Sequence, residues 1–120
     1  MAGSAPDRAG PLPRIRGTQV GLRNPGLVDE IKADMRAGRF AFQEPRGQIG
    51  GVLDPRDTYH VEEGHHRMVA ALELYAELGD PIIAQELLRW GRWARKQAPS
   101  SSRPMPARDW WGKLRNWLGY

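Results

Sequence analysis

Residues 48–78, QIGGVLDPRDTYHVEEGHHRMVAALELYAEL, decide the fold of this chain. Two short apolar runs, residues 49–53 and 58–61, flank residues 54–57 (DPRD). That tetrapeptide is typical of a turn, because Asp favours its first position and Pro fixes φ at its second. After Gly64, apolar residues recur at steps of three and four, the spacing of one helical face. The stretch predicts a β-hairpin whose second strand leads through Gly64 into a central helix.

The first turn of this predicted helix carries basic side chains where helices usually carry acids. Helix N-termini have partial positive charge and unpaired N–H groups, which favour Asp and Glu. Here His65, His66 and Arg67 follow Gly64. Backbone donors, two imidazoles and a guanidinium beside a glycine favour a site for phosphate oxygens. The alternative is that the imidazoles are solvated and Arg67 pairs only with the preceding glutamates.

The residue types suggest a different chemical role for each side chain at such a site. His65 or His66 is expected to act as general acid or base, because histidine titrates near neutral pH. Arg67 is expected to stabilise charge on phosphoryl oxygens. Glu62 or Glu63 is expected to orient a histidine, activate a water or hold Mg²⁺. The candidate cofactors are therefore Mg²⁺ or a nucleotide.

Glu63 is the principal glutamate candidate; Glu62 and three further side chains are secondary candidates. His60 faces either the same cleft or solvent, depending on strand register, and Gln19 and Arg23 lie at the end of a predicted first strand. A zinc site of the three histidines with Glu62 is disfavoured, because adjacent histidines on a helix point about 100° apart. The pattern also lacks the H-E-x-x-H spacing that places two ligands on one face. No metal ligand is assigned.

Length and composition limit the class of protein. The 120 residues suit one domain with a modest core. The absence of cysteine excludes disulfides, a thiol nucleophile and a thiolate metal site. No apolar run approaches the roughly 18 residues that a membrane span needs, and the N-terminus lacks the apolar segment of a secretory signal.

Charge is distributed unevenly along the chain. Residues 89–120 hold eight Lys or Arg against one Asp, a net charge of +7, whereas residues 1–88 carry −3. All five tryptophans lie in the basic part. This part is expected to pack on the body as core, to bind nucleic acid, or to lie on a membrane surface. The candidate nucleic-acid contacts are Arg92, Arg103, Arg108, Trp110 and Trp111.

The remaining segments complete the predicted order. Residues 1–17 are expected to be a flexible leader, followed by a strand over residues 18–22. A helix is predicted to start at Asn24, the cap, with Pro at its first position, and to end at Gly38. Residues 81–88 are ambiguous between strand and helix; a helix is favoured because Ile83, Leu87 and Trp90 share a face and Gly91 follows.

The C-terminal part is predicted to lie outside the core. Residues 97–107 are expected to form a linker with residues 100–102 as its most flexible part, before a final short helix capped by Asp109. The domain prediction is thus a leader over residues 1–17, an α+β core over 18–95, and a linker with a Trp/Arg-rich tail over 96–120.

This order, with residues 63–67 (EGHHR) opening a helix, resembles the ParB/sulfiredoxin-like superfamily over about residues 18–88. The resemblance implies a small α+β domain with a short mixed sheet and packed helices. It also implies that a G-x-x-R-type turn, Gly64 to Arg67 here, holds nucleotide phosphates. In such folds a second wall reaches the site, which here implies Gln19 and Arg23.

More closely, three segments are similar to the ParB-like C-terminal modules of bacterial polymorphic (Rhs-type) toxins: residues 18–25 (TQVGLRNP), residues 63–71, and residues 102–104 with 110–112. That similarity implies a nuclease that cleaves DNA or RNA in the bacterial cytoplasm. It further implies delivery as part of a longer secreted chain and an immunity protein as partner.

Departures from the family patterns narrow the function. The catalytic cysteine of sulfiredoxins is replaced by His65, which excludes sulfinic-acid reduction by that route. The chain is too short for the helix-turn-helix module of ParB partition proteins. A hydrolase acting on phosphodiester bonds therefore remains the principal hypothesis. The alternative is a module that binds or hydrolyses nucleotide, or transfers phosphate, without nuclease activity.

Overall fold

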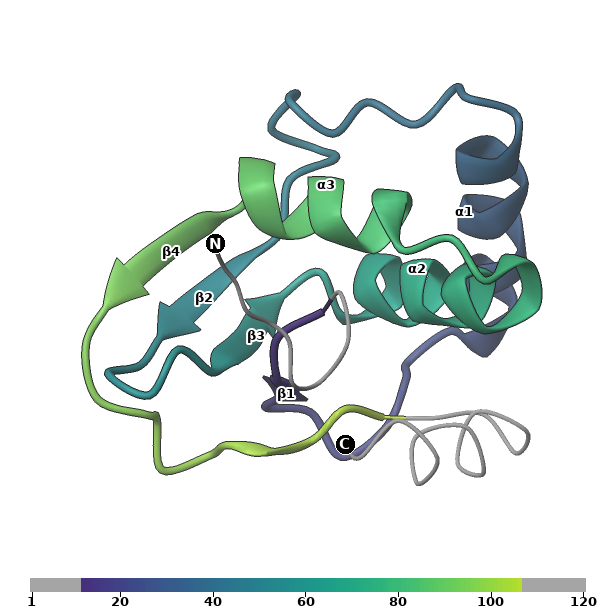
Figure 1. Cartoon of the computed structure of the whole chain (residues 1–120). Coiled ribbons are helices and arrows are strands. Elements are labelled where there is room, and N and C mark those ends of the chain that lie inside the picture. The colour runs from purple at the N-terminus through teal and green to yellow at the C-terminus, as the bar shows by residue number, and fades with distance from the viewer. Residues whose placement is uncertain (1–11, 107–120) are drawn as a thin grey trace.

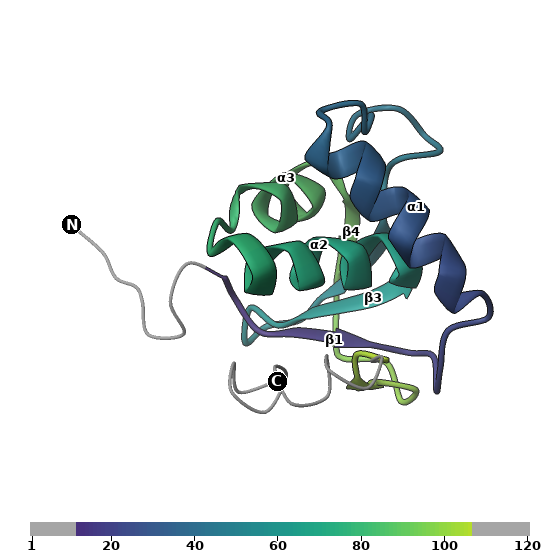
Figure 2. The same ribbon diagram turned by 90° about the vertical axis from the view of Figure 1, so that its right-hand side faces the viewer.

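Three helices cover one face of a five-stranded mixed sheet in this computed structural model, which describes residues 12–106 (Figure 1, Figure 2). The strand order is β4-β2-β3-β1-β5. β2 and β3 are antiparallel, β1 runs parallel to β3, and β4 runs parallel to β2. In chain order the elements are β1 (Ile15–Gly17), α1 (Pro25–Arg36), β2 (Gly50–Leu53), β3 (Tyr59–Glu63), α2 (His65–Leu78), α3 (Ile82–Trp90), β4 (Arg92–Arg95) and β5 (Arg103–Pro104).

The central hairpin and helix confirm the prediction from residues 48–78. β2 and β3 are joined by a turn in which the Asp54 carboxylate accepts the backbone N–H groups of Arg56 at 2.8 Å and Thr58 at 3.1 Å. β3 ends at Glu63, and α2 begins directly after Gly64. A layer of apolar side chains joins the helices to the sheet; its fully buried members include Ile15, Val28, Ile49, Val61, Met68, Leu72, Leu87 and Met105.

The two predicted helices that flank the centre also form. α1 begins at Pro25 as expected, but the expected cap by the Asn24 side chain is wrong, because that side chain makes no capping hydrogen bond. The helix favoured for the ambiguous residues 81–88 also forms, as α3 over Ile82–Trp90. Among residues 12–106, no helix is both long and apolar enough to cross a membrane.

The first strand lies earlier than predicted. It spans Ile15–Gly17 rather than residues 18–22, and Val20 within the predicted range is 83% exposed. Leu12 and Ile15 are buried in the core, so residues 12–17 belong to the folded unit and not to a flexible leader. The physical reason is that β1 is an inner strand, bonded to β3 on one side and β5 on the other. Residues 1–11 lie outside the described residues.

Two strands in the basic part were not predicted. β4 pairs with β2, and its Trp93 packs edge-to-face on Tyr59 with ring centroids 4.8 Å apart. β5 pairs with β1, and Met105 beyond it is buried. The prediction of a linker over residues 97–107 is therefore wrong where β5 forms. Pro104 tolerates this place because β5 is an edge strand.

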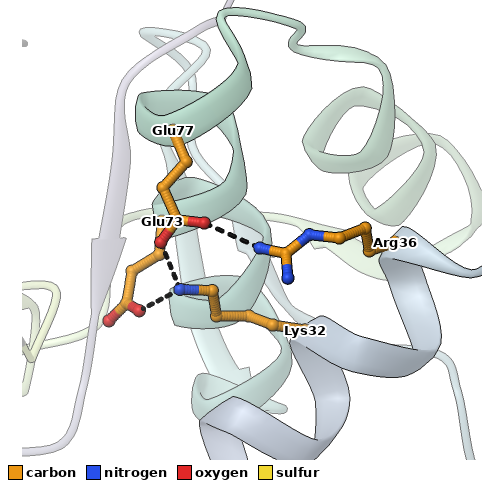
Figure 3. Close-up of polar contacts among 4 residues, drawn as sticks. All are labelled: Lys32, Arg36, Glu73 and Glu77. Carbon is orange, nitrogen blue, oxygen red and sulfur yellow. Dashed lines mark hydrogen bonds and ion pairs between the residues drawn. The ribbon is translucent and has the colours of Figure 1, made fainter.

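Charged side chains fix α1 against α2 (Figure 3). Lys32 Nζ lies 3.1 Å from Glu73 Oε1 and also contacts Glu77. Arg36 Nη2 lies 2.8 Å from Glu77 Oε1 at the outer end of the cluster. Glu73 is fully buried, and a buried carboxylate is stabilised by an ion pair such as the one with Lys32. The cluster sets the position of α1 and hence of the loop that precedes it.

Candidate functional site

A cavity of about 270 Å³ opens at the N-terminus of α2. The end of β3, the loop between β1 and α1, and one face of α1 enclose it. Leu27 and Ile31 supply an apolar wall. The other lining residues are all sequence-predicted site residues: Gln19, Arg23, Glu62, Glu63, Gly64, His65, His66 and Arg67. The structure thus brings the principal candidates together, along with three of the four secondary ones, Gln19, Arg23 and Glu62.

Gly64 makes the sharp passage from strand to helix. Its φ of 97° is in the left-handed region, which favours glycine. A Cβ atom there would lie 2.4 Å from Ile49 Cγ2 and 2.9 Å from Arg67 Nη1. Arg67 is held beside this turn because Nη1 donates to the Gln48 carbonyl at 3.0 Å. The guanidinium is therefore placed next to the unpaired backbone N–H groups of the first helical turn.

His65 is buried and mainly stabilises the fold, although it also lines the cavity. The residue is only 3% exposed, and its Nε2 accepts the backbone N–H of Thr18 at 3.0 Å. The Thr18 hydroxyl in turn donates to the Val61 carbonyl at 3.1 Å. Burial, with a smaller effect of His66, lowers the pKa of His65 to about 4. The ring is neutral at neutral pH with its proton on Nδ1, so the expected role as acid or base does not suit its surroundings.

His66 is bound to the same loop but lies nearer the surface. Its Nε2 accepts the backbone N–H of Asn24 at 3.1 Å. Burial lowers the pKa of His66, and the positive charges of Arg67 and Arg23 lower it further. The imidazole therefore experiences the field of two cations on opposite walls of the cavity. Such a field attracts an anion.

The hydrogen bonds of His65 and His66 give a reason why the first turn of α2 carries imidazoles and not carboxylates. Each presents an acceptor nitrogen to a backbone amide, one at Thr18 and one at Asn24, at the two ends of a single loop. These bonds hold the segment that carries Gln19 and Arg23 against α2. No spacing in the sequence identified Thr18 or Asn24 as partners, since each takes part through its main chain.

The two glutamates connect the cavity with a second hollow. Glu62 and Glu63 are exposed, and they also line a depression of about 450 Å³ over β2 and β4. There Glu63 Oε1 lies 3.6 Å from Arg92 Nη2. Arg92, a predicted nucleic-acid contact, thus lies beside the candidate site, whereas Arg103 is on β5 at the opposite edge of the sheet. Arg108, Trp110 and Trp111 lie outside the described residues.

His60, a secondary candidate, does not line the cavity. Its ring is 2% exposed and faces neither the cleft nor solvent, the two orientations expected. Nε2 lies 2.7 Å from Asp54 Oδ2 and Nδ1 lies 2.7 Å from Ser102 Oγ. The prediction failed because Ser102 comes from a segment that the sequence presented as a flexible linker.

The acidic and imidazole groups of residues 12–106 include no cluster of three or more arranged to hold a metal ion. Glu62 and Glu63 are the carboxylates at the cavity whose oxygens suit Mg²⁺. No protein-family model matches the sequence, and no curated protein or solved structure matches it. The resemblance to ParB-like domains accordingly stays a prediction.

Proposed function

We propose that this chain is a nuclease that holds a phosphate of DNA or RNA in the cavity at the N-terminus of α2. The observation that carries the proposal is the convergence of Arg23 and Arg67, from separate elements, on a cavity that also contains the N-terminal turn of a helix. Guanidinium groups and unpaired helical N–H groups are both suited to phosphate oxygens. Burial lowers the pKa of His66, and the positive charges of Arg67 and Arg23 lower it further, which is consistent with a positive field at the cavity.

The carboxylates are the better candidates for proton transfer. Both histidine Nε2 atoms already accept backbone amides, whereas Glu62 and Glu63 are exposed at the cavity mouth. One of them accepts a proton from the attacking water as the water oxygen bonds to phosphorus. The bond from phosphorus to the leaving oxygen breaks, and that oxygen takes a proton from solvent. His66, with its proton on Nδ1, donates a hydrogen bond to the phosphate.

The hydrogen bonds that both histidines accept from the loop also favour a second candidate function. A site whose imidazoles are occupied by loop amides is well suited to binding and less suited to acid–base catalysis. The second candidate is therefore a nucleotide-binding module without turnover, in which a bound phosphate controls the loop between β1 and α1. Nucleotide hydrolysis or phosphotransfer at the same cavity is the intermediate case.

Cleavage and binding assays on the full chain separate these functions. Plasmid DNA, single-stranded DNA, RNA and nucleoside triphosphates are offered with and without Mg²⁺. Cleavage that falls at least about tenfold in Arg67→Ala and in Glu63→Gln supports the nuclease. The matched control is Arg39→Ala, because Arg39 is exposed and pairs with Asp34 on the far end of α1. Nucleotide binding without any turnover supports the module, and failure of both overturns the two proposals.

The toxin resemblance adds a partner and a place of action. Under this proposal the domain acts in the bacterial cytoplasm after delivery with a longer chain, and an immunity protein neutralises it. Expression of the 120 residues in bacteria is then expected to arrest growth with degraded DNA or RNA, and Arg67→Ala to relieve the arrest. Normal growth with intact nucleic acids at matched expression would contradict the toxin proposal.

A further inference from the structure

Three polar side chains form a hydrogen-bonded series on the sheet face opposite the helices. Asp54 comes from the hairpin turn, His60 from β3, and Ser102 from the segment before β5. The Asp54 carboxylate lies 2.7 Å from His60 Nε2, and His60 Nδ1 lies 2.7 Å from the Ser102 hydroxyl. Asp54 and His60 are buried, whereas Ser102 is half-buried. The series therefore runs from an enclosed carboxylate to a hydroxyl that reaches the surface.

The positions of the protons follow from the partners. A carboxylate only accepts, so His60 Nε2 carries the proton that faces Asp54. The pKa of Asp54 is lowered, first by this bond to His60 and against the effect of burial. Arg16 Nε donates to Ser102 Oγ at 2.8 Å, and a guanidinium only donates. When the His60 ring is neutral, its Nδ1 is the acceptor to which the Ser102 hydroxyl donates.

The fold holds each member in place. Asp54 is fixed by the amides of the hairpin turn. Arg16 lies directly opposite His60 in the pairing of β1 with β3. Ser102 is fixed by its own N–H, which donates to the Pro99 carbonyl at 3.0 Å, and by the pairing of β5 with β1 immediately after it. Such support is what positioned catalytic groups require.

We infer that Ser102 is an activated nucleophile that accepts acyl groups from carboxylic esters, with His60 as its base and Asp54 as the group that orients His60. A serine, an imidazole and a carboxylate in this order are the parts of a nucleophilic hydrolase. Arg16 Nε donates to Ser102 Oγ, so the positive charge of the guanidinium stabilises negative charge that develops on this oxygen as its proton leaves. None of these four residues lines the phosphate cavity, so the inference is independent of the proposed function.

The reaction balances with water as co-reactant. Ser102 Oγ bonds to the ester carbonyl carbon while its proton passes to His60 Nδ1. The bond from that carbon to the alcohol oxygen breaks, and the leaving oxygen takes the proton from His60. Water then attacks the acyl-enzyme and gives its proton to His60, after which Ser102 Oγ leaves with that proton. The products are a carboxylic acid and an alcohol.

The test uses the full chain with p-nitrophenyl acetate as substrate and a fluorophosphonate as covalent probe. The probe is expected to label Ser102, as located by peptide mass mapping. Hydrolysis is expected to fall at least about tenfold in Ser102→Ala and in His60→Gln. Ser101→Ala is the matched control, because Ser101 is the exposed neighbour of Ser102. Asp54→Asn tests orientation and is expected to slow labelling without removing the nucleophile.

Loss of folding is separated from loss of chemistry by far-UV circular dichroism and thermal unfolding of every variant. Ser102→Ala is decisive among them, because it removes one half-buried oxygen and leaves the hairpin turn intact. Absence of label from Ser102, equal labelling of Ser101, or hydrolysis unchanged in a folded Ser102→Ala variant would overturn the inference.

Discussion

His65 Nε2 accepts the backbone N–H of Thr18 at 3.0 Å, which joins the start of the central helix to a residue 47 positions earlier. The bond requires an unprotonated nitrogen, and burial keeps it so by lowering the pKa of His65 to about 4. Protonation of this ring therefore opposes folding and detaches the loop that carries one wall of the phosphate cavity.

Stability is expected to fall on acidification because of His65. The ordinary pKa of a histidine is 6.5, whereas burial lowers the pKa of His65 to about 4 in the fold. The unfolded chain thus binds more protons in that interval, and the contribution of His65 is complete above pH 6.5 and lost as pH falls toward 4. The loss amounts to about 3 kcal/mol at most. Urea unfolding from about pH 7.5 to about pH 4.5 measures it.

Two variants control that measurement. His65→Gln removes the titrating ring and is expected to flatten the dependence of unfolding free energy on pH. His66→Gln is the matched control and is expected to keep most of the dependence, because His66 is less buried. Equal pH dependence in wild type and His65→Gln would contradict the role assigned to His65.

Gly64→Ala is expected to cost more stability than Gly79→Ala. Both glycines have left-handed φ, 97° and 74°, at opposite ends of α2. A Cβ at Gly79 meets nothing within 4 Å, whereas one at Gly64 meets Ile49 at 2.4 Å. Backbone strain alone is worth about 1 kcal/mol, so we expect about that for Gly79→Ala and at least about 3 kcal/mol for Gly64→Ala. Urea unfolding compares them, and equal losses would refute the packing described at Gly64.

Phosphate binding is expected to raise the pKa of His66. Burial lowers that pKa and the charges of Arg67 and Arg23 lower it further, and an anion between the two arginines offsets their field. NMR titration of the imidazole, with and without inorganic phosphate or a nucleotide, measures the change. Arg23→Ala is expected to shift the pKa upward even without ligand, whereas Arg39→Ala is expected to leave it unchanged. A His66 titration that is indifferent to every phosphate ligand would place anion binding elsewhere.

Lys32→Met is expected to destabilise the fold by about 3–5 kcal/mol, because it leaves the buried charge of Glu73 without this partner. Arg36→Ala, at the exposed end of the same cluster, is expected to cost less than about 1 kcal/mol. Figure 3 shows the two basic side chains approaching α2 from the same helix. Chemical unfolding of both variants checks the contrast, and similar small losses would show that the cluster contributes little to holding α1.

Deletion of residues 108–120 is expected to weaken nucleic-acid binding and to flatten its salt dependence. These residues hold three Lys or Arg and one Asp, so the slope of log affinity against log salt is expected to fall by about two to three. Deletion of residues 1–11, which hold one Arg and one Asp, is the charge-neutral control. An unchanged slope after the C-terminal deletion would assign that segment a structural role.

Local features of the sequence predicted the centre of the fold well. The hairpin, the turn at Asp54, the passage at Gly64 and the two flanking helices each depend on neighbours within a few positions. Six of the ten cavity residues lie together for the same reason, since residues 62–67 form one continuous strand–turn–helix segment. The predicted start of the helix directly after Gly64 is confirmed, whereas the left-handed φ of Gly64 was not predicted.

Features that depend on distant partners were missed. β4 and β5 acquire their pairing from β2 and β1, more than 40 residues away along the chain. The basic residues of Arg92–Arg95 are typical of a solvent-exposed segment. This segment forms a strand because it pairs with β2. The roles of His65 and His66 as acid or base were predicted from residue type alone. In the structure the Nε2 atoms of both rings accept backbone N–H groups of the loop between β1 and α1, and the position of that loop depends on α1.

The antiparallel pairing of β1 with β5 also determines how the domain responds to tension. Arg16 is bonded opposite Pro104, and Gly17 opposite Arg103, so the incoming and outgoing chain leave this pair at the same end. A force that pulls both ends apart therefore opens the pair one bridge at a time, in a peeling mode with low mechanical resistance. If the chain is pulled through a narrow pore from its C-terminal end, the edge strand β5 is expected to detach first. Its detachment also moves Ser102 away from His60.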